Sequence, residues 1–210
     1  AVSDTPTHDA SGSVAGFADA TGRYLPLVCT LNAARILDAA CRILGKTHDE
    51  VAQLALSAKP GANGLTLLPY FEGERTPNRP TATGVFAGMN LNNSNPEDIA
   101  RAMVEGMLAG LADAVDALVA LGVGVNRILL IGGAAKNPAV PAIASALFGR
   151  EVLVPPAGEY VADGAAKQAA WALLGRLPTW DLGEVSHHKS EATPEVMMRY
   201  RELKNNTQNW

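Results

Sequence analysis

The sequence has few cysteines, few aromatic residues and little net charge. Of its 210 residues, two are cysteine and 5% are aromatic, and the formal net charge is −4. The two cysteines, Cys29 and Cys41, lie in apolar surroundings, which predicts reduced core residues of a cytoplasmic protein. A slightly acidic chain argues against nucleic acid as a main partner, because binding to phosphates needs clustered Lys and Arg.

Long hydrophobic runs and two common nucleotide motifs are also missing. No apolar stretch approaches membrane-spanning length and no signal peptide is visible, so we expect no membrane partner. The phosphate-binding pattern Gly-x-x-x-x-Gly-Lys-Ser/Thr does not occur. The dinucleotide fingerprint fails as well, because Pro155 and Pro156 stand where it requires an acid at the end of the next strand. With 48% apolar residues, the chain is long enough to bury one core.

The most informative stretch that is present surrounds a pair of glycines. An apolar run at 128–131 predicts a buried strand, and Gly132 and Gly133 follow it directly. Asn137 and Pro138 are then typical of a helix start, with free N–H groups on the same side as the glycines. A strand, a glycine pair and a helix are typical of a nucleotide site, although the same pattern also forms tight turns that bind nothing.

Three motifs in order resemble the FGGY family of carbohydrate kinases, the actin-like sugar kinases that include glycerol kinase and xylulokinase. The first is the adenosine-binding turn Gly-Gly-x-x-x-Asn/Ser, which residues 132–137 match. The second is the run Gly-Leu-Thr-Leu-Leu-Pro-Tyr-Phe-Glu-Gly-Glu-Arg-Thr-Pro at 64–77, where xylulokinases usually have Ser in place of Glu72. The third is a Gly-Ala-Ala-rich helix at 161–171, in which Asp163 replaces a residue that is more often apolar. The resemblance extends from about residue 11 to 177 and is strongest to xylulokinases.

For the fold, the resemblance implies an α/β, ribonuclease-H-like (actin-like ATPase) domain, with a mixed sheet and helices on both faces. Residues 1–176 are expected to be the C-terminal, nucleotide-binding domain of a sugar kinase, and residues 177–210 a tail with a helix. The chain begins without Met, as if in mid-strand. We therefore expect an N-terminal half outside this chain, carrying the catalytic base and the sugar site.

For the activity, the resemblance implies an ATP-dependent kinase that uses Mg²⁺ and converts D-xylulose to D-xylulose 5-phosphate. The expected partners are ATP, a ketopentose and the N-terminal half of the same kinase, and a homodimer stays open. No catalytic or metal-binding residue is assigned in this chain, and the chain alone is expected to be inactive. The alternatives are a kinase of ribulose, gluconate or glycerol, or a non-catalytic actin-like nucleotide-binding module. The Glu-Arg-Thr-Pro run at 74–77 favours the sugar kinase.

The same resemblance implies the nucleotide contacts. Gly132, Gly133, Ala134 and Asn137 are expected to form a shelf for the adenosine. Members of the family have a Gly-Ala-Ala sequence near the nucleotide phosphates, and Asn32 takes the place of its Gly. The Asn32 amide is expected either to donate to a phosphate or only to cap a helix. The nucleotide-contacting Gln of the relatives falls on an isoleucine, residue 36, which cannot form that hydrogen bond.

The remaining segments predict elements and local contacts. Helices are predicted at 30–45, from 47 or 49 to 58, from 137, at 94–121, 163–175 and 194–205, and strands at 65–71, 84–88, 128–131 and 152–154. A hairpin within 13–29 is expected to supply the first antiparallel strands. A Glu74–Arg75 ion pair is expected to pin a loop, and His187 and His188 are expected in a loop. Small residues around 106 and 110 predict close backbone approach.

Overall fold

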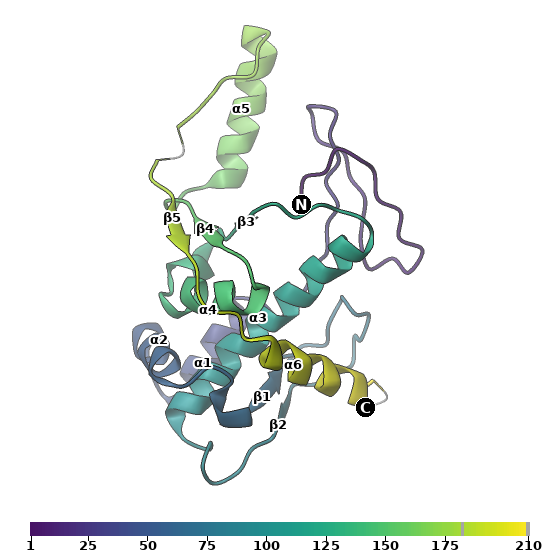
Figure 1. Ribbon diagram of the computed structural model, residues 1–210. Coiled ribbons are helices and arrows are strands. Elements are labelled where there is room, and N and C mark those ends of the chain that lie inside the picture. The colour runs from purple at the N-terminus through teal and green to yellow at the C-terminus, as the bar shows by residue number, and fades with distance from the viewer. Residues whose placement is uncertain (182, 209–210) are drawn as a thin grey trace.

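The computed structural model describes residues 1–181 and 183–208 and combines helices with two small sheets (Figure 1). In chain order, the elements are α1 (Arg35–Leu44), α2 (His48–Ser57), the 3-10 turn η1 (Ala62–Gly64), β1 (Thr66–Leu68), β2 (Val85–Ala87), α3 (Pro96–Ala120), β3 (Ile128–Leu129), the 3-10 turn η2 (Gly133–Lys136), α4 (Ala139–Phe148), β4 (Val152–Val154), α5 (Tyr160–Leu174), β5 (Ser186–His188) and α6 (Pro194–Asn206).

The sheets are short, and one of them is mixed. Strands β1 and β2 pair antiparallel, while β3 and β4 run parallel and β5 joins β4 antiparallel. Within residues 1–30, the structure shows antiparallel bridges, Ala15 with Leu27 and Ala18 with Tyr24, instead of the regular strands that we expected. The predicted hairpin therefore forms, but as isolated bridges outside the β3–β4–β5 sheet.

Helix α3 lies at the centre and contacts α1, α2, α4, α6 and β1. It begins at Pro96, two residues later than the predicted 94, because the Asn95 side chain caps it by accepting from the backbone N–H of Asp98. The predicted close approach is confirmed at Gly106, where a Cβ atom would lie 2.5 Å from the carbonyl oxygen of Leu67 in β1. Helix α3 and strand β1 therefore pack with almost no side chain between them.

The C-terminal segment packs back onto this centre. Helix α6 contacts β1 and α3, and it buries Val196, Met197 and Tyr200. Tyr200 and Tyr70, the latter just after β1, are among the largest fully buried side chains. The burial of Tyr70 raises its pKa to about 12. The tail is thus part of the main hydrophobic core.

Strand β5 corrects the expectation for the two adjacent histidines. We expected His187 and His188 in a loop, but they pair with Leu153 and Val152 of β4. Nδ1 of His187 lies 3.1 Å from a carboxylate oxygen of Glu151. Backbone hydrogen bonds hold this polar strand at the edge of the sheet. Its side chains do not alternate between apolar and polar, so the sequence pattern does not predict a strand there.

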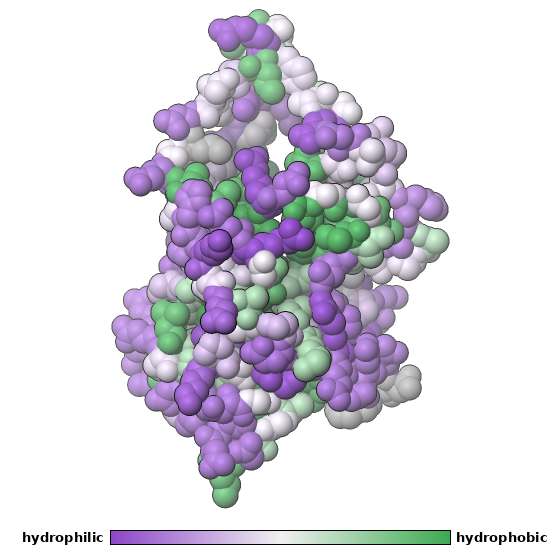
Figure 2. Space-filling model, viewed as in Figure 1, coloured by the Kyte–Doolittle hydropathy of each residue, from purple (hydrophilic) through white to green (hydrophobic). Residues whose placement is uncertain are grey.

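Helix α5 differs from the others because none of its side chains is buried, and it extends away from the rest of the chain in Figure 1. Val161 and Leu173 are 88% and 85% exposed. Figure 2 shows hydrophobic residues gathered below α5. Leu129 of β3 and the nearby Ile131 are also exposed. Among the helices that the structure describes, none combines the length and the apolar character needed to cross a bilayer.

Candidate functional site

The two glycines after β3 differ in their backbone conformation. Gly132 has φ 98° and ψ −179°, a region that is essentially restricted to glycine. Gly133 begins η2 without a positive φ, and a Cβ atom there would meet nothing within 4 Å. Gly132 therefore makes the turn, whereas Gly133 leaves open space in front of the backbone.

Asn137 ends the turn and begins the next helix, as its sequence context predicts. Its Oδ1 accepts from the backbone N–H of Ala139 at 3.0 Å, which caps α4. Its Nδ2 is enclosed and has no hydrogen-bond partner among the residues that the structure describes. Because the cap fixes the orientation of the amide, this nitrogen remains a donor without an acceptor. An unpaired buried donor costs about 1–3 kcal/mol, which an acceptor on a ligand would recover.

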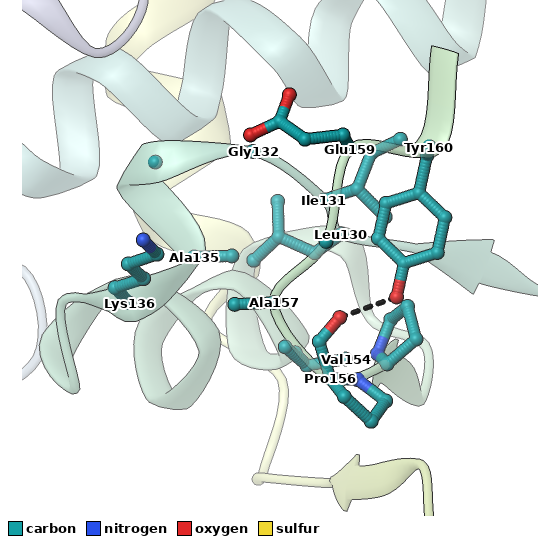
Figure 3. A pocket seen from close by; sticks show the side chains of 13 residues that line it. Leu130, Ile131, Gly132, Ala135, Lys136, Val154, Pro156, Ala157, Glu159 and Tyr160 are labelled. Atoms are coloured by element: carbon teal, nitrogen blue, oxygen red, sulfur yellow. Dashed lines mark hydrogen bonds between the residues drawn. The ribbon is translucent and has the colours of Figure 1, made fainter. Parts of the chain in front are cut away.

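A cavity of about 530 Å³ lies between the glycine turn and the start of α5 (Figure 3). Gly132, Gly133 and Lys136 line one side, and Glu159 and Tyr160 line the side that faces them. The Tyr160 hydroxyl donates to the carbonyl of the proline at 156, which closes the β4–α5 loop onto itself. The cavity thus has an ammonium group and a carboxylate on different elements.

A second cavity, of about 360 Å³, lies on the other side of the same turn. Its lining residues come from the start of α1, the start of α2 and η2: Ala34, Leu37, Asp38, His48, Asp49, Gly133, Ala134, Lys136 and Asn137. Gly133 and Lys136 line both cavities. The two cavities therefore border the same turn at Gly133, and we treat them together as one candidate site.

The structure brings four of the five expected contact residues to this site. Gly132 lines the first cavity, Gly133 lines both, and Ala134 and Asn137 line the second. The fifth, Asn32, lines neither cavity.

Asn32 instead points into the protein. Its Nδ2 donates to the carbonyl of Gly73 at 2.6 Å and to Glu74 at 2.9 Å, and its Oδ1 accepts from the N–H of Phe71 at 3.1 Å. With these bonds the amide has no donor directed toward a phosphate. It does not cap α1 either, since that helix begins at Arg35 with no side-chain cap. We therefore leave Asn32 out of the candidate site.

Glu74 holds the same loop, although not through the expected ion pair. Its buried carboxylate accepts from the backbone N–H groups of Leu31 at 2.7 Å and Arg75 at 2.8 Å, in addition to Asn32. Within the described part of the chain, the Arg75 side chain is exposed and makes no ion pair, whereas Arg35 pairs with Glu72. The structural role expected for Glu74 is therefore present with different partners.

Two neighbouring substitutions should separate these roles. Glu74→Gln replaces one carboxylate oxygen by an amide nitrogen, so that two donors, this nitrogen and Nδ2 of Asn32, face each other. We expect a loss of about 1 kcal/mol of folding free energy. Arg75→Ala should change stability by less than about 0.5 kcal/mol, as for an exposed side chain without partners. Urea denaturation of both variants checks this, and an equal loss in the two would contradict it.

The sequence did not draw attention to Asp38 and His48. Asp38 Oδ1 lies 3.2 Å from Nε2 of His48, and both line the second cavity. Only the spacing along the helix could have indicated Asp38, because Ala34, Leu37 and Asp38 lie on one helix face. Ile36, where relatives have the glutamine, is instead buried in the core.

The two cysteines are free thiols, as expected, but both are only half-buried, so the prediction that they are core residues is wrong. Burial raises the pKa of the Cys41 thiol, and the nearby charge of Asp38 raises it further. At neutral pH this thiol is therefore protonated and unreactive. We assign it no role in the site.

Comparison with known proteins now identifies the family. The sequence profile of the FGGY family of carbohydrate kinases, C-terminal domain, matches residues 6–173. A xylulose kinase from Streptomyces rubiginosus is 39% identical over 179 residues, which cover 85% of this chain and 35% of that protein. The chain therefore spans about a third of the length of the curated relatives that it matches.

Solved structures agree with this result. The crystal structure of a xylulose kinase from Bifidobacterium adolescentis is 50% identical, with a TM-score of 0.88 over 97% of this chain and 41% of that one. The crystal structure of a glycerol kinase from Plasmodium falciparum with ADP shares the fold, with a TM-score of 0.77 at 17% identity. The match covers 99% of this chain and 44% of the glycerol kinase chain. The expected α/β, actin-like ATPase fold with a mixed sheet is confirmed. The chain belongs to the FGGY family of carbohydrate kinases and carries the C-terminal domain of that family.

Proposed function

We propose that this chain is the ATP-binding half of an ATP-dependent sugar kinase, and that the complete enzyme phosphorylates D-xylulose to D-xylulose 5-phosphate. The observation that carries the proposal is the open space at Gly133, a residue that lines both cavities. A nucleoside has a flat base joined to a sugar and phosphates. It needs two adjoining spaces and a backbone that it can approach closely.

The residues of this chain would bind and orient the nucleotide. Gly132, Gly133 and Ala134 offer backbone without bulky side chains, so that the adenosine can lie against the turn. Asn137 caps α4 and holds an unpaired donor beside the second cavity. Lys136, which lines both cavities, supplies a positive charge that suits a phosphate group.

Kinases also use Mg²⁺, which supplies charge neutralisation at the transferred phosphate when it is bound. Among residues 1–181 and 183–208, no three His, Cys, Asp or Glu side chains gather in an arrangement that could hold a metal ion. The residues present do not fit a protein-held magnesium, so we assign it no ligand in this chain. We place the catalytic base and the sugar site in an N-terminal half outside this chain. This fits the observation that the chain spans about a third of the length of its relatives.

Gly133→Val in the complete kinase tests the proposal. Two methyl groups would occupy the open space at Gly133, so the Michaelis constant for ATP should rise at least tenfold, which is about 1.4 kcal/mol. The Michaelis constant for D-xylulose should change little, because the sugar site lies elsewhere. Steady-state rates with both substrates varied give these values.

Gly124→Val is the matched control. Gly124 also lacks a positive φ and also has nothing within 4 Å of a Cβ position, but it lines neither cavity. It should leave both Michaelis constants as in the wild type. Thermal unfolding of both variants checks the fold. A folded Gly133→Val enzyme with normal use of ATP would refute the proposed site.

A further inference from the structure

Helix α5 turns an apolar side toward solvent. Residues at helical spacing form one uncharged surface, the α5 face, which consists of Val161, Ala162, Ala165, Ala166, Ala169 and Leu173. All six are exposed, and the two largest, Val161 and Leu173, are 88% and 85% exposed. Lys167 and Trp171, on the other side of the helix, are instead half-buried. The α5 face therefore points away from this chain, whereas a surface helix normally turns such a face toward the core.

No described part of this chain covers the α5 face. None of the 15 residues of α5 is buried, and no helix or strand that the structure describes packs extensively against it. Figure 1 shows α5 extending away from the other elements. A continuous apolar surface that stays exposed on a protein marks a place where something else binds.

The composition of α5 limits what can cover this face. The helix has one acidic and one basic residue, Asp163 and Lys167. A helix that lies on a membrane surface has a strongly charged opposite side, rich in Lys and Arg, so a lipid surface does not fit. The alanines in the middle of the α5 face allow another backbone to approach closely, and Val161 and Leu173 add apolar area at its two ends. The α5 face therefore suits a protein partner with an apolar surface.

A second copy of this chain is a poor match for a face of this size. With 15 residues, α5 is about 22 Å long, and one side of it offers roughly 200–400 Å². A stable dimer buries roughly 800 Å² on each partner. Two parts of one covalent chain can hold together through a smaller contact, because their linkage keeps them at a high effective concentration.

The relatives of this chain contain such a second part. In full-length kinases of the family, the C-terminal domain pairs with an N-terminal domain. The structural match covers 41% of the solved relative from Bifidobacterium adolescentis, so more than half of that protein lies outside it. We infer that the α5 face is a docking surface for the N-terminal half of the same kinase. The inference rests on the proposed function and adds the surface through which the two halves join.

Photochemical cross-linking in the complete kinase identifies what covers this face. Leu173 is replaced by p-benzoyl-phenylalanine, and the peptides that become linked on irradiation are identified by mass spectrometry. The links should lead to the N-terminal half. The matched control places the same group at Leu91, which is 97% exposed and lies between β2 and α3, at the other end of the molecule from α5 (Figure 1). It should give no links to that half.

Hydrogen exchange gives an independent measurement on the complete kinase. Leu173→Glu would bury a charge in the docked surface, so the backbone amides of α5 should exchange at least about tenfold faster than in the wild type. Leu91→Glu adds the same charge at a leucine outside the α5 face and should leave the exchange of α5 unchanged. Equal exchange in the wild type and in Leu173→Glu would show that α5 is undocked, which overturns the inference.

The cross-links also identify other occupants. Links from position 173 to this domain itself would show that α5 folds back onto its own chain, and covalent dimers of the kinase would show that a second copy covers the face. Either result overturns the inference, as does the absence of links. Neither measurement needs a nucleotide. A kinase whose halves join through α5 but which does not bind ATP would therefore refute the proposed function alone.

Discussion

Replacing Arg101 by Met is expected to lower the free energy of unfolding by about 3–5 kcal/mol. Nε of Arg101 lies 2.6 Å from a carboxylate oxygen of Glu105, and the two side chains are only 7% and 4% exposed. The same oxygen accepts from the N–H of Gly61 at 2.9 Å, and the guanidinium donates to the carbonyl of Ala55. Without Arg101, the buried carboxylate of Glu105 loses its ion-pair partner and keeps only the smaller influence of the Arg199 charge, and that accounts for the large cost.

The loss in this variant should depend on pH. Burial raises the pKa of Glu105, and the charge of Arg101 is the largest influence that opposes this rise. Removing the guanidinium should raise the pKa further. A carboxyl with a raised pKa in the folded state stabilises the fold at low pH, and this contribution is lost as the pH rises. The deficit relative to the wild type should therefore be larger at pH 8 than at pH 5.

Urea denaturation at these two pH values measures the deficit. Adding Glu105→Gln to Arg101→Met should recover much of the stability, because the amide oxygen still accepts from Gly61 and carries no charge. Equal deficits at both pH values, together with no recovery in the double variant, would show that the lost packing of the arginine stem explains the effect.

Gly106→Ala should have the second largest effect, a loss of about 2–3 kcal/mol. The added Cβ would lie 2.5 Å from the carbonyl oxygen of Leu67 and 3.0 Å from its Cβ. Neither atom can turn aside, because both belong to the backbone or the first side-chain carbon of a buried strand. Helix α3 must therefore move away from β1, and this cost exceeds the gain of about 1 kcal/mol in helix propensity.

Gly110→Ala is the control, with the same change one turn further along α3. Its Cβ would meet only the Tyr200 hydroxyl, at 3.4 Å, which is an ordinary contact. We expect this variant to be as stable as the wild type or slightly more stable. Thermal unfolding of the pair decides the matter, and equal midpoints would mean that α3 and β1 are not in close backbone contact.

Local patterns predicted most of the elements of this fold. The apolar run at 152–154 became β4 with the predicted bounds, and the Asn137–Pro138 pair starts a helix as expected. Helix α1 begins five residues later than predicted, at Arg35. The reason lies outside the segment, because Asn32 is bonded to Gly73 and Glu74, about 40 residues along the chain. A single sequence carries no signal for such a pairing.

The candidate site was predicted only in part for the same reason. The glycine turn is continuous in sequence, so its motif gave Gly132 and Gly133 directly. The second wall of the site comes from α1 and α2, and Asp38 and His48 meet there through the packing of these two helices. Neither residue belongs to a motif. Their positions at the cavity depend on which face of α1 turns toward η2, and only the three-dimensional arrangement determines that.

The position of α6 has a consequence for the order in which the chain folds. Its residues are synthesised after those of β1 and α3, yet α6 contacts both elements and buries Val196, Met197 and Tyr200. Arg199 donates to the carbonyl of Gly61, 138 residues earlier. On the ribosome, β1 and α3 therefore emerge with part of their apolar surface uncovered, and contacts of such long sequence separation form slowly. Until α6 emerges, this uncovered surface is prone to aggregation.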